Sequence, residues 1–193
     1  MFKQLIRRWT AWKIETGRLP HGRTSSLTSS SVGQRNPEPG AGSAVLTAHT
    51  DLVARHIRGE TEIGRRQVRD RKFTTAGRDA LIDAFTNTFE PETFNYHDCG
   101  TGTGAESNTD TALGNPVSEA RVAGTQSQPT SDTYRTVATF TFSNTYAITE
   151  HGIFSQASKP GGILLDRTVF SAINVVSGDK IEFTFSLSIA AEA

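Results

Sequence analysis

The clearest pattern of apolar and polar positions lies near the C-terminal end of the chain. Apolar residues alternate there with polar ones, and the apolar set contains Ile181, Phe183, Phe185, Leu187 and Ile189. A period of two is typical of a strand with one face in a core and the other in water. Turn-forming clusters at residues 159–162 and 177–179 separate further β-rich segments. The last third of the chain therefore predicts a series of short strands.

The middle of the chain predicts one helix, over residues 74–87. Thr74 or Thr75 can cap its start, and Pro91 limits how far it continues. Its inward stripe is expected to contain Leu81, Ala84 and Phe85.

Strand patterns flank a long polar region after this helix. Residues 94–98 alternate as a strand, a polar loop region extends to about residue 132, and residues 134–142 resume β structure. This order predicts a mainly β body over residues 69–193, an antiparallel β-sandwich or jelly-roll-like domain with one helix.

The start of the chain has a helical period instead. Its apolar positions, Phe2, Leu5, Ile6, Trp9 and Trp12, follow i, i+3, i+4, i+7, i+10 spacing, and basic residues largely take the other flank. We therefore expect a short amphipathic helix over residues 2–15. Such a stripe can lie on a membrane or in a protein groove, and its short length favours a groove.

Residues 17–46 lose this periodicity and are rich in Gly, Ser, Thr and Pro. Such a composition cannot bury enough apolar area to offset the entropy of ordering. We therefore divide the chain into an extended basic N-terminal arm, residues 1–68, and a β-rich body, residues 69–193.

The formal charge of zero conceals a division between the two parts. Residues 1–72 carry 14 Lys and Arg against 6 Asp and Glu, whereas residues 73–193 carry 6 against 14. The first part therefore has a net charge of +8 and the second a net charge of −8. A basic arm seeks acidic surface, which neighbouring copies of the body, another acidic protein or nucleic acid could each provide. The basic run at residues 65–72 contains no aromatic residue, so it predicts a charged strand or a phosphate-only contact.

Cys99 is the single cysteine, which excludes an internal disulfide and fits assembly in a reducing cytoplasm. We expect it to be a half-buried structural thiol near a strand end. No apolar run is long enough to span a bilayer, and basic residues interrupt the N-terminal apolar positions, so a secretory signal is not predicted.

Gly100-Thr-Gly-Thr-Gly104 invites comparison with phosphate-binding loops. Acidic residues follow it at positions 106 and 110, and no βαβ pattern surrounds it, so a flexible turn leaving a strand is the favoured interpretation.

Five potential ligands and catalytic groups remain: His97, Asp98, Cys99, Glu150 and His151. Adjacent residues of a strand point to opposite faces, so His97 and Asp98, or Glu150 and His151, should not share one ion. A site of His97, Cys99 and His151 requires that their two strands pair, and it lacks the paired spacing of zinc sites. Cys99 with His97 could resemble an activated thiolate, but the pair lacks a recognisable oxyanion loop or third partner. We therefore expect no metal, no cofactor and no enzymatic activity.

The C-terminal strands also carry a resemblance to a known family. Ile148-Thr-Glu-His-Gly-Ile-Phe154, residues 162–176 and Gly178-Asp179 resemble tailed-bacteriophage proteins that are mostly described only as hypothetical or virion structural proteins. The resemblance extends back through residues 69–94 and 100–104 to cover residues 69–189, and none of its shared motifs is catalytic.

The resemblance implies a non-enzymatic virion structural protein, assembled in the host cytoplasm. We expect a capsid decoration or cement protein that stabilises the shell by binding across major capsid subunits, because an arm gives multivalent attachment. The alternative is a tail or tail-fibre component, either an adaptor or host-facing. The expected partners are the major capsid protein and copies of the chain itself, as a trimer or dimer, and neither nucleic acid nor membrane is expected. The partner-binding residues of the arm are predicted to be Phe2, Leu5, Ile6, Arg7, Arg8, Trp9 and Trp12.

Overall fold

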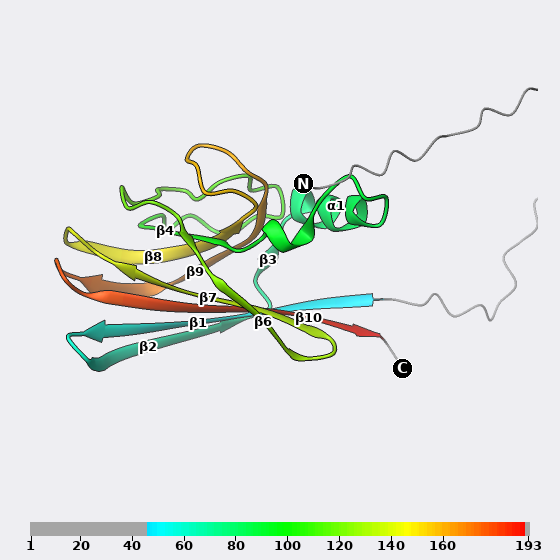
Figure 1. The fold of residues 1–193 in the computed structure, drawn as a ribbon. Coiled ribbons are helices and arrows are strands. Elements are labelled where there is room, and N and C mark those ends of the chain that lie inside the picture. Colours follow the sequence, from blue (N-terminus) through cyan, green and yellow to red (C-terminus); the bar gives the residue numbers. More distant parts are fainter. Residues whose placement is uncertain (1–45, 192–193) are drawn as a thin grey trace, which may run out of the picture. The chain divides into compact units, whose positions relative to one another are not determined.

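The computed structural model describes residues 46–191 of the chain. These residues form two five-stranded antiparallel sheets that face each other, with one α-helix at one end (Figure 1). The predicted mainly β, antiparallel body with one helix is therefore confirmed. Residues 1–45, including the predicted arm anchors from Phe2 to Trp12, lie outside the described residues.

The two sheets divide the strands in a simple order. Sheet A contains, from edge to edge, β2 (Thr61–Arg69), β1 (Leu46–Arg58), β10 (Lys180–Ala191), β7 (Thr133–Thr141) and β6 (Thr125–Thr130). Sheet B contains β3 (Lys72–Phe73), β9 (Leu164–Val175), β8 (Tyr146–Phe154), β4 (Tyr96–Gly100) and β5 (Val122–Ala123). The central strands are β10 and β8.

The hydrophobic core lies between the inner faces of the sheets. The alternation that predicted β10 is confirmed, because Ile181, Phe183 and Phe185 are each fully buried. Phe183 packs edge-on against Phe140 of β7, with ring centroids 5.7 Å apart. Burial of such large apolar side chains stabilises the sandwich.

The structure corrects the boundary of the arm. Residues 46–68, predicted to belong to it, contribute β1 and nearly all of β2 to sheet A, and β1 pairs with β10 from Leu46↔Ala191 to Ile57↔Lys180. Every second residue of β1 between Thr50 and His56 is buried. The residues between them, Asp51, Val53 and Arg55, lie on the other face, and Arg55 pairs with acids on the two neighbouring strands.

The predicted helix is confirmed as α1 (Thr75–Ala84), and a 3₁₀ turn, η1 (Pro91–Thr93), follows it. The hydroxyl of Thr74 caps α1 by accepting a hydrogen bond from the Gly77 N–H. A Cβ at Gly77 would lie 2.8 Å from the Leu165 Cα, so glycine lets α1 approach β9 closely. The predicted inward stripe is wrong for Phe85, which follows the last helical residue and is 89% exposed.

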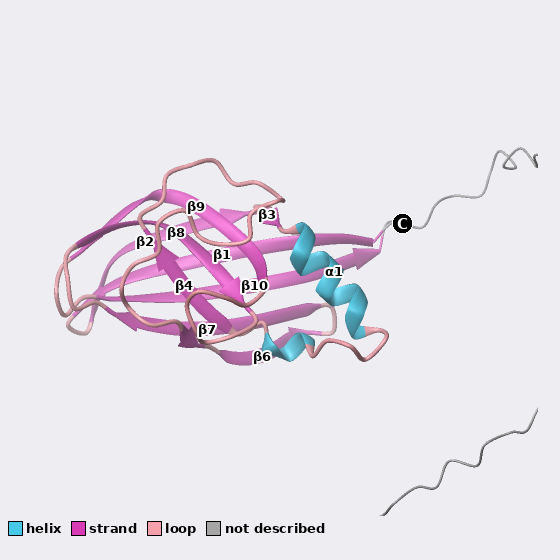
Figure 2. Ribbon diagram, turned by 90° about the horizontal axis from the view of Figure 1, so that it is seen from above, coloured by secondary structure: helices cyan, strands magenta, loops and turns pink. Residues whose placement is uncertain are grey.

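Viewed from above, α1 lies across the end of the sandwich at which β1 begins and β10 ends (Figure 2). The predicted polar loop before residue 132 contains two strands that the sequence pattern missed, β5 and β6. Every residue of β6 is exposed, so it shows no apolar alternation.

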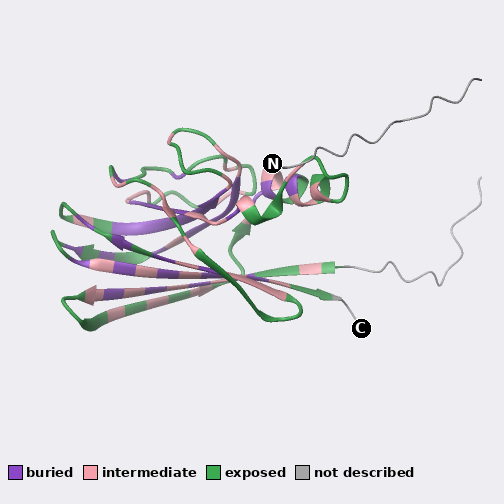
Figure 3. Cartoon of the chain, in the orientation of Figure 1, coloured by how far each residue is buried: buried purple, intermediate pink, exposed green. Residues whose placement is uncertain are grey.

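The rest of this loop region covers the outer face of sheet B. Residues Ile148–Phe154 of β8 are buried without alternation, because sheet A covers one face and loop residues cover the other (Figure 3). A second, small core of Leu113, Phe154 and Leu164 forms outside the sheet. Most of the polar groups described below lie on this covered outer face of sheet B.

Candidate functional site

Three of the predicted ligand candidates meet on the inner face of sheet B. The condition for their meeting is fulfilled, because β4 pairs with β8 in a register that places Cys99 opposite His151. His97 Nδ1 and His151 Nε2 share a hydrogen bond of 3.0 Å, and His97 Nε2 contacts the Thr136 hydroxyl at 3.1 Å. The imidazoles therefore lie in the core, between the sheets.

This environment suppresses the chemistry of the three side chains. Burial lowers the pKa of His97 to about 3. Burial, with the neighbouring His97, holds the pKa of His151 well below its ordinary value. Burial also raises the pKa of the Cys99 thiol, which is fully buried rather than half-buried as predicted. A thiol held in its protonated form is a poor nucleophile and a poor metal ligand.

Asp98 and Glu150 lie on the opposite face, as the alternation of the strands predicted. A register irregularity between Ile148 and Glu150 of β8 lets Thr149 contact the outer loop as well. The Thr149 hydroxyl donates to the Gly102 carbonyl, and the Gly102 N–H donates to Glu150. Two consecutive side chains thereby bind the same glycine of the loop.

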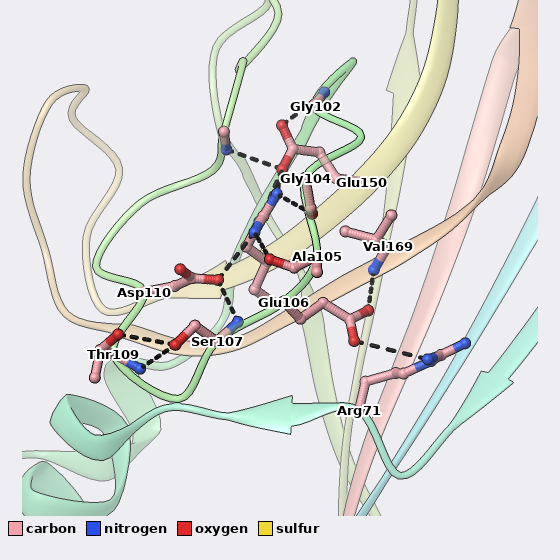
Figure 4. A network of polar contacts seen from close by, with 12 residues as sticks. Arg71, Gly102, Gly104, Ala105, Glu106, Ser107, Thr109, Asp110, Glu150 and Val169 are labelled. Carbon is pink, nitrogen blue, oxygen red and sulfur yellow. Dashed lines mark hydrogen bonds and ion pairs between the residues drawn. The ribbon is translucent and has the colours of Figure 1, made fainter.

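Glu150 is the centre of this outer network, which Figure 4 shows from close by. Its carboxylate accepts hydrogen bonds from the backbone N–H groups of Gly102 at 3.0 Å, Gly114 at 2.9 Å and Asn115 at 2.7 Å. Arg167 of β9 adds two contacts, from Nε at 2.9 Å and from Nη2 at 2.8 Å. Five N–H groups thus converge on one fully buried carboxylate.

Arg167 extends the network further into the loop. Its Nη1 contacts the Asp110 carboxylate at 2.9 Å, and Asp110 also accepts from the Ser107 N–H at 2.9 Å. Glu106 accepts from the Val169 N–H and lies 3.7 Å from Arg71 (Figure 4). The acids that follow the glycines are therefore engaged with the body.

Two glycines of the glycine-rich segment, Gly100 and Gly102, are required by this internal anion. A Cβ at Gly100 would lie 2.5 Å from Glu150 Oε1, and one at Gly102 would lie 2.4 Å from the same atom. Backbone N–H groups that converge in this way form an anion-binding concavity. The anion here is the chain's own Glu150, which leaves these N–H groups no capacity for a phosphate. The segment leaves β4 at Gly100, as predicted.

Asp98 anchors a second cluster on the same face. Arg121 Nε lies 3.1 Å from one Asp98 oxygen and Lys159 Nζ lies 2.6 Å from the other. Arg121 also donates to the carbonyls of Gln156, Ser158 and Gly161. Its guanidinium lies 3.5 Å from the centroid of the Phe154 ring. Asp98 thus fixes the loop between β8 and β9 to the sheet.

The five candidates therefore divide between two faces and do not form one site. Within residues 46–191, no group of three or more His, Cys, Asp or Glu side chains is arranged to hold a metal ion. In the same part of the chain, no helix has the length and apolar character needed to cross a membrane.

The basic run at residues 65–72 is largely engaged within the body. Arg65 pairs with Glu62, and Arg69 pairs with Asp51. Arg66 donates to backbone carbonyls of Ser171 and Ala172. These contacts favour the interpretation as a charged strand, which the position of β2 at the edge of sheet A explains.

The feature that the sequence did not reveal is an apolar pocket at the α1 end of the sandwich. It has a volume of about 780 Å³, and its apolar walls include Leu81, Pro91, Phe94, Tyr134, Leu187 and Ile189. Glu92 and Asp132 also line it, and none of its lining residues is basic. We call it the end pocket. Its residues come from α1, η1, β6, β7, β9 and β10, which is why no local motif signals it.

Comparisons with known protein families, with curated proteins and with solved structures found no match to this chain. The predicted arm anchors, Phe2, Leu5, Ile6, Arg7, Arg8, Trp9 and Trp12, lie outside the described residues.

Proposed function

We propose that the protein is a non-enzymatic structural component of a bacteriophage virion. The observation that carries this proposal is that its potentially reactive side chains are buried or bonded within the fold. Glu150 and Asp98 fix loops to sheet B, and His97, Cys99 and His151 are enclosed in the core. A side chain that is buried and bonded within the fold is unavailable to a substrate.

The role within the virion that we propose is capsid decoration. The body sits over junctions between major capsid subunits, and the basic arm, through Phe2, Leu5, Ile6, Arg7, Arg8, Trp9 and Trp12, anchors the assembly. Support comes from the resemblance of residues 69–189 to virion proteins and from the opposite charges of arm and body. Copies of the body associate as a trimer or dimer, because closed symmetry adds avidity on a symmetric shell.

Copy number tests this role. Quantitative mass spectrometry of purified particles should find the chain in numbers comparable with the major capsid protein. A handful of copies per particle would instead support the second candidate, a tail or tail-fibre component. Absence from particles would refute both.

Deletion of residues 1–45 provides the complementary test. The truncated chain should give the β-rich circular dichroism of the full chain but no longer bind particles that lack the protein. A well-folded truncated chain that still decorates particles to full occupancy would show that the arm does not provide attachment.

A further inference from the structure

We propose that the end pocket binds residues 2–13 of a second copy of this chain. The proposal deepens the self-association proposed above and rests on it, since it names both partner surfaces. It also chooses among the acidic surfaces that the basic arm could seek.

The first observation is an uncovered part of the core face of sheet A. Leu46 has the same parity along β1 as the buried Leu52, yet it is 74% exposed. Ile189 has the same parity along β10 as the buried Leu187, yet it is 47% exposed and lines the end pocket. The register places these two strand ends side by side, since Ala48 pairs with Ile189. Sheet A thus presents core-type residues that sheet B does not cover.

The helix adds further apolar surface at the same end. Ile82 is 59% exposed and Phe85 is 89% exposed, and α1 lies across the strand ends in both views (Figures 1 and 2). Leu81 of α1 lines the pocket itself. An apolar pocket at an end of the molecule that also carries exposed apolar residues is typical of a site that binds another protein segment.

Charge and pattern identify the occupant. The pocket carries Glu92 and Asp132 and no basic residue. Residues 2–13 carry the apolar set Phe2, Leu5, Ile6, Trp9 and Trp12 with the cations Lys3, Arg7, Arg8 and Lys13, and no acid precedes Glu15. An apolar stripe at i, i+3, i+4 and i+7 is the pattern by which amphipathic segments occupy apolar grooves. A basic flank then faces an acidic rim.

The length of the intervening chain allows exchange between copies. Residues 14–45 can span at most roughly 110 Å when extended, whereas a domain of this size has a radius of gyration of about 15 Å. The described chain begins at Leu46, two residues before Ala48, which pairs with the pocket residue Ile189. When two copies of the body meet at the pocket end, residues 2–13 of each copy can therefore reach the end pocket of the other. In a symmetric dimer or trimer, each end pocket then receives one such segment.

Tryptophan fluorescence of the full-length chain tests the proposal without particles. Trp9 and Trp12 are the two tryptophans of the sequence, so the emission comes from the segment alone. We expect the emission to shift to shorter wavelength as protein concentration rises, in step with the mass from light scattering. Emission typical of water-exposed tryptophan at every concentration would overturn the proposal. A blue-shifted emission in a strict monomer would also overturn it, since the segment would then occupy its own pocket.

Matched variants locate the binding surface. Ile189→Lys should raise the concentration at half-shift by about tenfold or more, whereas Ile63→Lys should not, although Ile63 on β2 is 48% exposed against 47% for Ile189. Glu92→Lys should weaken association, and Glu60→Lys, in the β1–β2 turn, should not. If Ile189→Lys does not fold, the comparison of Glu92→Lys with Glu60→Lys still tests the proposal. Equal effects of a pocket variant and its control would refute the pocket as the site.

Discussion

Glu150→Gln tests whether an internal carboxylate holds the glycine-rich loop. The substitution preserves the size of the side chain but removes its charge and replaces one acceptor oxygen by an NH₂ donor. Oε1 accepts from Gly102 and Asn115, and Oε2 accepts from Gly114 and Arg167. Either orientation of the amide therefore leaves at least two donors facing another donor.

The expected cost follows from burial. Glu150 is fully buried and Arg167 is 4% exposed, so removing one partner leaves a buried guanidinium with Asp110 as its remaining carboxylate. Breaking a buried pair in this way costs roughly 3–5 kcal/mol. For a domain of about 150 residues, this loss lowers the melting temperature by roughly 6–20 °C.

Urea denaturation followed by circular dichroism measures the effect on the full chain. Glu62→Gln is the matched control, because Glu62 also contacts two arginines, Arg55 and Arg65, but its side chain is 30% exposed. We expect the control to change little. Hydrogen exchange should also rise at the Gly102 and Gly114 amides in Glu150→Gln. A midpoint for Glu150→Gln equal to that of the control would refute the reasoning.

Two further predictions concern the histidines of the core. Between about pH 6.5 and pH 4 the free energy of unfolding should fall as pH falls, because His97 and His151 have lowered pKa values and protonate only when unfolded. Burial raises the pKa of Asp166 to about 7, and this group acts in the opposite direction, so the fall is smaller than the two histidines alone would give. Urea titrations at several pH values check it, and a flat profile would contradict it. Gly124→Ala should cost roughly 2–4 kcal/mol, because its Cβ would lie 2.1 Å from the Thr136 hydroxyl that contacts His97. Gly104→Ala, where a Cβ would meet nothing within 4 Å, should be nearly neutral, and similar midpoints for the two variants would contradict this reasoning.

The elements that sequence predicted well are those whose burial follows one local rule. β10 alternates strictly because one face packs against sheet B and the other stays in water. α1 was predicted because Thr74 can cap its start and Pro91 limits its continuation. β1 was missed as a strand because its buried positions include Thr50 and His56, which weakens its apolar alternation, and β6 was missed because both of its faces are exposed.

The polar sites were predictable only in part. Alternation correctly separated Asp98 from His97 and Glu150 from His151, since that rule depends on the backbone alone. The rule does not reveal that residues 102–115 fold back over Glu150, which depends on contacts distant in sequence. The end pocket has the same origin, because its walls come from six separate elements.

The pairing of β1 with β10 has a consequence for synthesis of the protein. His56 pairs with Ile181, so the middle of sheet A joins segments that leave the ribosome far apart in time. At typical translation rates, β1 waits on the order of ten seconds for β10. The β8–β9 hairpin can pair during that interval, whereas β1 and β2 remain without the strand that completes their sheet. Folding is therefore expected to finish late and slowly, as for other β proteins of high contact order, and chaperones that shield nascent strands should raise the yield of soluble protein.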